Sequence, residues 1–270
     1  MSEFYTLGKF TARVNSENPN GPPYDPTKTE PLLEASRIKK ATQGDIIAQA
    51  ELQNRETQRQ EEIANSPEAK IAQAEKVIAD MREWLTQDGT YSTEQIDNIL
   101  SELTVEYDND TDQAITSGSL NLRSLTSAEG LTLPQSVGGD LDLLSLTSAE
   151  GLTLPQSVGG TLYLLSLTSA EGLILPQSVG GSLYLNYLTS AEGLTLPQSV
   201  GGRLRLDSLT SAEGLTFPES VGGDLDLYDL TSAEGLDFPQ SVGGSLWLTS
   251  LTPEDRQKIY ELRPDLHIYV

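Results

Sequence analysis

The stretch LTSAEGLTLPQSVGG, residues 125–139, decides the fold of this chain. It returns almost unchanged five more times, starting at Leu146, Leu167, Leu188, Leu209 and Leu230. Six residues separate one copy from the next, so the period is 21 residues, and four of those six residues differ between copies. A short, regular period is typical of a solenoid, in which each copy forms one coil and stacks on its neighbours.

Each copy carries the apolar alternation of a short β-strand. Leu141 and Leu143 alternate with aspartates, which predicts that the leucines point to one side and the varying residues to the other. Leu152, Leu154 and Val158 provide further inward side chains. One coil alone cannot bury these groups, so we expect stacked coils, with leucine columns inside and strands that pair in parallel.

Turn signals lie between the apolar segments of each copy. Thr147 followed by Glu150 has the spacing of a capping box, which predicts a single helical turn. Gly151 then ends this turn in the left-handed conformation. The Gly-Gly pair at 159–160 predicts the sharp corner that returns the chain to the next strand.

The capping-box glutamate recurs in every copy. The resulting column consists of Glu129, Glu150, Glu171, Glu192, Glu213 and Glu234. Like charges at one-coil spacing repel one another, which a bound divalent cation would relieve. The alternative is that each glutamate faces solvent within its own capping box. We favour the second interpretation and expect no metal site.

The repeat resembles the leucine-rich-repeat superfamily through the pattern LxLxxL, here Leu141, Leu143 and Leu146, together with LTLPQSVGG. The portion LTLPQSV is similar to the VTIPxSV element of bacterial BspA-type repeats, and GGxLxL is similar to repeats in bacterial and phage proteins. The resemblance covers about half of the chain. It implies an α+β repeat fold: a right-handed, leucine-rich-repeat-like parallel β-solenoid with helical caps at both ends. Many such repeats carry asparagine where Leu146 stands, so a two-sheet β-solenoid is the alternative architecture.

Four regions follow from composition and pattern. We predict an extended N-terminal arm at 1–31, a helical region and N-terminal cap at 32–104, the 21-residue repeats at 105–251 and a C-terminal cap at 252–270. The arm is rich in Pro, Gly and Asn after a few apolar residues. It is either a disordered tail or a peptide that docks on a partner. In the docking interpretation, its anchor residues are Phe4, Tyr5, Leu7 and Phe10.

Helix signals are clear on both sides of the repeats. Ser66 as N-cap before Pro67 predicts a helix that ends at Gly89, and a further helix begins after Ser92. These two helices are expected to pair as a hairpin and cover the first coil, because the end of a stack exposes its apolar interior. Thr252 begins another short helix, which is expected to seal the opposite end.

The six copies also act as an internal alignment. Positions expected to be exposed, such as Ser127 and Gln135, barely change between copies, whereas the outward strand positions differ widely. Solenoids bind partners on extended surfaces, and Tyr, Trp and Arg are favoured at binding hot spots. We therefore predict a partner-binding surface that comprises Asp142, Tyr163, Tyr184, Tyr187, Arg203, Arg205, Asp226, Tyr228 and Trp247.

Two alternatives to binding stay open at these positions. Exposed residues also change by neutral drift. Arg203 and Arg205 precede Asp224 and Asp226 by one coil, so they can pair across neighbouring strands, at about 0.2–1 kcal/mol per pair.

Composition argues against several classes of activity. A net charge of −23 disfavours nucleic acid and anionic membrane as partners, because both require cationic surfaces. The chain has no cysteine, and its only histidine, His267, is interpreted as an ordinary residue. The pairs at 140/142 and 224/226 lie four coils apart, roughly 19 Å at strand spacing, too far for one acid–base pair. We expect neither enzymatic activity nor a cofactor.

The expected function is non-catalytic binding. The outward strand positions would recognise a protein or a glycan, and residues 1–104 would attach the chain to a larger assembly. The alternative is a structural or decoration component of a bacterial or phage particle, in which the repeats form a rigid spacer. The N-terminus lacks the basic start and apolar run of a signal peptide, and no apolar stretch approaches the ~18 residues of a membrane helix. A cytoplasmic or particle-associated location, the virion included, is therefore expected.

Overall fold

A computed structural model of the chain describes residues 35–36, 38, 46–109, 111–234 and 236–269. The chain forms two compact units, Met1–Asn65 and Ser66–Val270. In the first unit, helix α3 spans Ile46–Ala64, and its side chains from residue 49 onward are exposed apart from that of Leu52. The predicted arm at 1–31, with its anchor residues Phe4, Tyr5, Leu7 and Phe10, lies outside the described residues.

The second unit begins with two helices at the predicted positions. Helix α4 spans Pro67–Asp88; the Ser66 side chain caps its start, and Gly89 ends it in the left-handed conformation with φ 75°. Helix α5 spans Thr93–Ser101 and begins with a capping box formed by Ser92. The two helices contact each other, and their buried apolar side chains belong to the same core as the repeat leucines.

A β-hairpin that the sequence analysis did not predict follows these helices. Strands β1 (Thr104–Asp108) and β2 (Gln113–Ser117) pair antiparallel, and both pack against α4. Thr116 in β2 accepts a hydrogen bond from the Gly138 amide at 2.7 Å, which joins the hairpin to the first full coil. The parallel strands of the repeats therefore stack against a hairpin whose own two strands are antiparallel.

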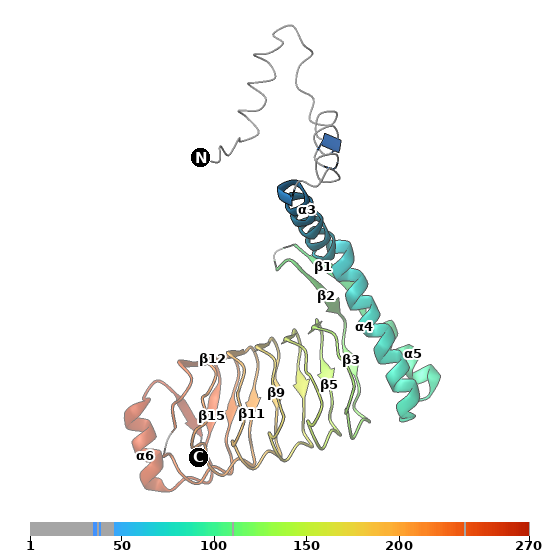
Figure 1. Ribbon diagram of the computed structural model, residues 1–270. Helices are drawn as coiled ribbons and strands as arrows, with labels where there is room; N and C mark the ends of the chain where they lie inside the picture. Colours follow the sequence, from blue (N-terminus) through green and yellow to red (C-terminus); the bar gives the residue numbers. More distant parts are fainter. Residues whose placement is uncertain (1–34, 37, 39–45, 110, 235, 270) are drawn as a thin grey trace, which may run out of the picture. The chain divides into compact units, whose positions relative to one another are not determined.

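The repeats form a parallel β-solenoid with two sheets (Figure 1). The eight-stranded sheet contains β3 (Leu120–Asn121), β5 (Leu141–Asp142), β7 (Leu162–Tyr163), β9 (Leu183–Tyr184), β11 (Leu204–Arg205), β13 (Leu225–Asp226), β15 (Ser245–Trp247) and β16 (His267–Tyr269). The six-stranded sheet contains β4 (Ser136–Val137), β6 (Ser157–Val158), β8 (Ser178–Val179), β10 (Ser199–Val200), β12 (Ser220–Val221) and β14 (Ser241–Val242). The predicted parallel solenoid is confirmed, and it has the two sheets of the alternative architecture.

The core consists of apolar columns that run from coil to coil. Leu141 and Leu143 are fully buried, as are their counterparts in the other coils, and Leu152, Leu154 and Val158 are buried too. The inward pattern predicted from the alternation is confirmed. Full burial of one leucine contributes about 1.5–3 kcal/mol, so the stack is stabilised by every coil rather than by one central cluster.

The two kinds of repeated glycine have different causes. Gly151 has φ 71°, as predicted for a residue that ends a turn. The glycines at 159–160 form the bend between a strand of one sheet and a strand of the other, which confirms the predicted corner, but their backbones are not left-handed. A Cβ atom on Gly159 or Gly160 would lie less than 3.0 Å from the backbone of the preceding coil. Glycine is required there because successive coils approach too closely for any side chain.

The predicted capping box is wrong in its detail. Ser148, not Thr147, accepts the hydrogen bond from the Glu150 amide, at 3.1 Å. Thr147 instead donates its hydroxyl to the Thr126 carbonyl of the preceding coil at 3.2 Å. This segment forms a turn rather than a helix. The threonine therefore stabilises the contact between coils, and the serine stabilises the turn within one coil.

The C-terminal segment returns to the solenoid. Helix α6 spans Pro253–Leu262 and begins at the predicted N-cap, Thr252. Arg263 then donates to the Pro239 carbonyl of the last coil at 2.6 Å. Strand β16 follows and pairs in parallel with β15, an addition that the sequence analysis did not predict. None of the helices among the described residues has the length and apolar character needed to span a bilayer.

Candidate functional site

The candidate site is the outer surface of the eight-stranded sheet, which we call the variable face. Its central column, in strand order, is Asn121, Asp142, Tyr163, Tyr184, Arg205, Asp226, Trp247 and Tyr269. Six of the nine predicted partner-binding residues lie in this column. Arg203 lies one column before it, Tyr228 lies one column after it, and Tyr187 follows in the turn with 59% of its surface exposed.

A first aromatic cluster lies on β7 and β9. The rings of Tyr163 and Tyr184 stack with centroids 5.3 Å apart and planes 12° apart. The guanidinium of Arg205 lies over the ring of Tyr184, 5.9 Å from its centroid, within the range of a cation–π interaction. Both tyrosines are half-buried, so each ring keeps an exposed part.

A second aromatic cluster lies near the C-terminus. Trp247 and Tyr269 stack with centroids 4.4 Å apart, and Tyr228 lies 6.0 Å from Trp247 at a tilt of 49°. His267 lies 5.8 Å from Tyr269. Sequence reasoning missed Tyr269 because it treated the last residues only as a cap. The alternation of HIY, with an apolar residue between two outward ones, was the signal available for an added strand.

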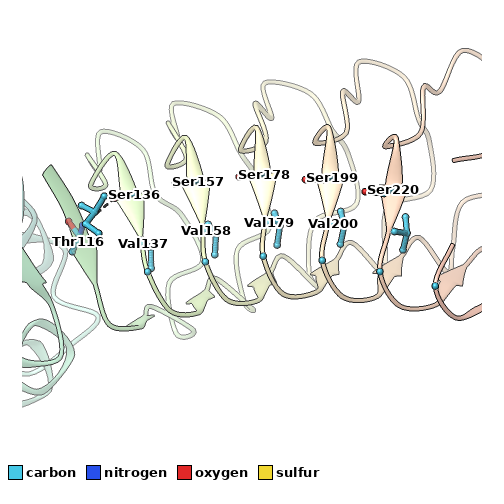
Figure 2. Close-up of a pocket in the computed structure, with 18 of the residues that line it drawn as sticks. Thr116, Ser136, Val137, Ser157, Val158, Ser178, Val179, Ser199, Val200 and Ser220 are labelled. Atoms are coloured by element: carbon cyan, nitrogen blue, oxygen red, sulfur yellow. Dashed lines mark hydrogen bonds between the residues drawn. The ribbon is translucent and has the colours of Figure 1, made fainter. Parts of the chain in front are cut away.

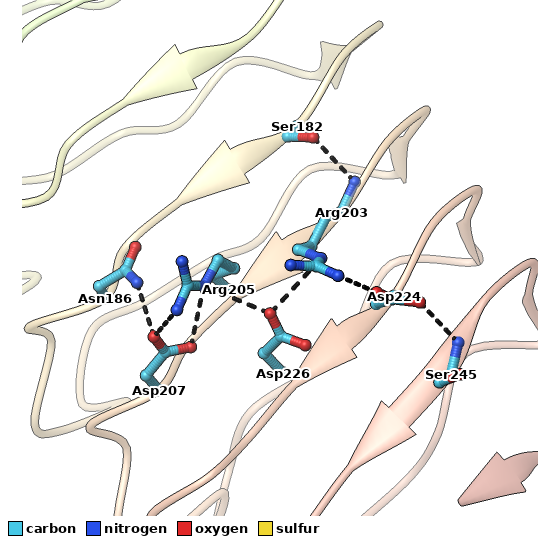
Figure 3. A network of polar contacts seen from close by, with 8 residues as sticks. All are labelled: Ser182, Asn186, Arg203, Arg205, Asp207, Asp224, Asp226 and Ser245. Atoms are coloured by element: carbon cyan, nitrogen blue, oxygen red, sulfur yellow. Dashed lines mark hydrogen bonds and ion pairs between the residues drawn. The ribbon is translucent and has the colours of Figure 1, made fainter. Parts of the chain in front are cut away.

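An ionic network lies between the two aromatic clusters in strand order. Figure 3 shows the residues of this network. Arg203 pairs with Asp224, and its Nε lies 3.6 Å from Asp226. Arg205 pairs with Asp207 on its own coil, and its Nε lies 3.3 Å from Asp226. The pairing across neighbouring strands, considered as an alternative for these arginines, is therefore present. Both guanidinium groups are already engaged within the protein.

Asp226 has the most perturbed carboxyl group of this network. Its side chain is 0% exposed, and neither of its oxygens accepts a hydrogen bond. Burial raises its pKa to about 6, against the opposing attraction of Arg203 and, more weakly, of Arg205. In contrast, a hydrogen bond from the Ser245 amide, aided by Arg203, lowers the pKa of Asp224. Asp226 is therefore covered by its larger neighbours, Arg205 and Trp247, and its assignment to the partner-binding surface stays a prediction.

A cleft opens at the N-terminal end of the variable face. It has a volume of about 650 Å³, and helix α5 and the first coils line it together. Asn98 and Glu102 border it on the helical side, whereas Asp140, Asp142 and Tyr163 border it on the sheet side. Sequence reasoning placed the helices only as a cap and did not predict that they help to form a cleft.

A groove, which we call the serine groove, runs along the six-stranded sheet (Figure 2). It has a volume of about 630 Å³, and serine, valine and glycine of successive coils line it. None of its lining residues is charged or aromatic. Its chemistry repeats from coil to coil, so this groove lacks the variation that distinguishes the variable face.

The glutamate column lies apart from both hollows. All six of its side chains are exposed, and each glutamate amide donates to the serine two residues earlier, as Glu171 does to Ser169 at 3.1 Å. Across the described ranges, no cluster of three or more His, Cys, Asp or Glu residues has the geometry to hold a metal ion.

Comparisons with models of protein families, with curated proteins and with solved structures found no match to this chain. The function must therefore be argued from the geometry of the variable face itself.

Proposed function

We propose that this chain is a non-catalytic binding protein whose variable face recognises a protein or glycan partner. The observation that carries the proposal is the contrast between the two solenoid surfaces. The serine groove is nearly identical in every coil, whereas the variable face gathers two stacked aromatic clusters on a regular lattice of strands. Half-buried aromatic rings suit recognition, because they offer a large apolar area at little cost in conformational entropy.

We further propose that the fold is of the leucine-rich-repeat type, with α4 and α5 as the N-terminal cap and α6 as the C-terminal cap. The support is that apolar side chains of these helices join the leucine core, among them Met81, Leu85, Ile96 and Ile259. In this proposal, residues 1–104 attach the protein to a larger assembly, and the solenoid presents the variable face. A cytoplasmic or particle-associated location belongs to the same proposal.

The test measures which partners the full-length protein captures. Bacterial lysates supply candidate proteins, and a glycan array supplies candidate glycans. Substituting Tyr163, Tyr184 and Trp247 together by Ala should remove at least about 2 kcal/mol of binding free energy, because such anchors dominate interfaces. The matched control replaces Ser157, Ser178 and Ser199 by Ala in the serine groove and should leave capture intact. Equal capture by both variants would refute recognition through the variable face.

A structural role is the second candidate function. The observation that favours it is the near identity of successive coils, which gives the repeats a constant rise and an uncharged groove. A decoration component or spacer would tolerate the aromatic substitutions but would respond to a change in the number of coils. The two candidates therefore give opposite results with the same pair of variants.

A further inference from the structure

We propose that the cleft between α5 and the first coils receives a lysine or arginine side chain from a basic segment of a partner protein. This inference rests on the proposed function, because the cleft is the N-terminal end of the variable face. It goes further by naming the chemistry that this end recognises.

The shape of the cleft suits a side chain rather than a flat surface. Residues of α5 line the helical side of the cleft, and Tyr163 is among the residues that line its sheet side. The two sides belong to the same compact unit, and α5 contacts β3 directly. A volume of about 650 Å³ accommodates an extended side chain together with the backbone that carries it.

The charge of the cleft favours a cation. Glu102, Asp140 and Asp142 contribute three carboxylates, whereas Arg123 is the one basic residue that lines it. Arg123 lies 3.8 Å from Asp142 and is more than half exposed, so it neutralises the cleft only in part. The net charge of −23 adds a long-range field that attracts basic partners and repels anionic ones.

Hydrogen bonds hold the cleft carboxylates in place. Asp142 accepts from the Leu144 amide at 3.1 Å, and Asp140 accepts from the Thr161 amide at 2.6 Å. In both cases Oδ1 is the acceptor, so the orientation of each carboxylate is set before a ligand arrives. Such preorganisation reduces the entropy lost on binding.

The aromatic wall already shows an affinity for cations. On the side away from the cleft, the guanidinium of Arg205 lies over Tyr184, which stacks on Tyr163. Tyr163 presents the same kind of ring to the cleft, beside carboxylates. A ring next to a carboxylate binds an ammonium or guanidinium group through cation–π and Coulomb attraction together. A neutral sugar would use the ring but would leave the excess negative charge unmatched.

The probe is a fluorescent peptide of alternating lysine and glycine–serine units, compared with the same peptide carrying acetyl-lysine. Fluorescence anisotropy with the full-length protein should show binding of the lysine peptide, which weakens with salt, and little binding of the acetylated one. Asp142→Asn should weaken binding by about tenfold. The amide oxygen of this variant still accepts from the Leu144 amide, so the turn is retained.

The matched control is Asp229→Asn, which removes the same charge from an exposed position outside the cleft. A general attraction to an acidic protein would make both variants equally weak and would overturn the proposal. Tyr163→Leu should weaken binding, whereas Tyr163→Phe should retain it, because phenylalanine keeps the ring. Chemical shift changes at the cleft with maltose but not with the lysine peptide would also overturn it.

This experiment separates the cleft from the rest of the variable face. If Asp142→Asn leaves peptide binding unchanged while the triple aromatic variant still loses its captured partner, the cleft proposal fails and the proposed function stands. If the lysine peptide binds through the cleft and a double variant, Tyr184→Ala with Trp247→Ala, which keeps the cleft residue Tyr163, captures normally, the cleft proposal stands and recognition by the aromatic clusters fails.

Discussion

Asp226 occupies a position that carries a partly exposed side chain in neighbouring coils, yet it is completely buried. Its partners in register are Arg205 on one side and Trp247 on the other, both much larger than aspartate. The face therefore closes over an aspartate that stands between two long side chains. The consequence is a carboxyl group that prefers its neutral form at a pH where ordinary aspartates are ionised.

Replacing Asp226 by Asn should change how the free energy of unfolding depends on pH. Because the folded pKa lies near 6, above the ordinary value of 3.8, the folded state binds the proton more tightly than the unfolded state does. Its stabilising effect is complete below pH 4 and is lost as the pH rises through 6. Relative to Asp226→Asn, the wild type should therefore lose about 2–3 kcal/mol of unfolding free energy between pH 4 and pH 7.

Urea denaturation of both proteins at the two pH values measures this difference. Asp229→Asn removes an exposed carboxyl from the same coil and should show no comparable dependence on pH. A constant difference in unfolding free energy between wild type and Asp226→Asn would show that the buried carboxyl titrates normally.

Alanine substitutions at two glycines of one copy, Gly214 and Gly222, test why glycine recurs in the repeat. Gly214 has φ 75° and open space around its Cα, so alanine there should cost about 1–2 kcal/mol through backbone strain alone. A Cβ atom on Gly222 would lie 2.9 Å from the carbonyl carbon of Gly201. Alanine there must push two coils apart and should cost about 3 kcal/mol. Thermal or urea unfolding of the two variants gives the order, and a larger loss for Gly214→Ala would contradict close approach as the cause.

At the level of elements, local signals proved predictive and remote pairing did not. The starts of α4, α5 and α6 are encoded by Ser66, Ser92 and Thr252, whose side chains act within one turn. Each strand of the six-stranded sheet is a serine and a valine followed by two glycines, so it has one inward side chain and no alternation to reveal it. Strand β1 pairs with β2 across a short turn, and β16 has its own alternation, so local signals for these strands existed; their packing on α4 and pairing with β15 could not be read from them. Most residues of the two aromatic clusters could be predicted, because comparing the copies of the repeat shows which strand positions vary. The cleft could not be predicted, because it forms only where α5 lies against the first coils.

Strand β16 should contribute to the stability of the second aromatic cluster. Tyr269→Ala removes the ring stacked on Trp247 and should cost about 1 kcal/mol beyond the lost apolar burial. In a Trp84→Phe background, the emission reports on Trp247 alone and should move to longer wavelength as water reaches the indole. Tyr187→Ala, which removes an exposed ring outside this cluster, is the control. Unchanged emission after Tyr269→Ala would mean that the stack does not shield Trp247.

At the scale of the whole solenoid, stability and function depend differently on the number of coils. Neighbouring coils interact mainly with each other, so stability is close to a sum over coils and their contacts. Each interface repeats the same hydrogen bonds, such as those from the Gly159 and Gly180 amides to Val137 and Val158, both at 2.8 Å. A whole extra coil therefore fits without strain, whereas a partial coil breaks every column at once.

Duplicating residues 167–187 should give a protein that folds with at least the stability of the parent and with a larger urea m-value, because more surface is buried. The added coil moves Tyr163 away from Trp247 by about 4.8 Å. A rigid partner that spans both aromatic clusters would then lose contact with one of them, and its affinity should fall by about tenfold or more. Repeating only residues 167–176 is the control, because half a coil turns leucines outward and should prevent folding. Full affinity in the folded 21-residue duplication would show that no rigid partner spans the face. It would leave recognition to one cluster or to the cleft, each of which keeps its own geometry when a coil is added.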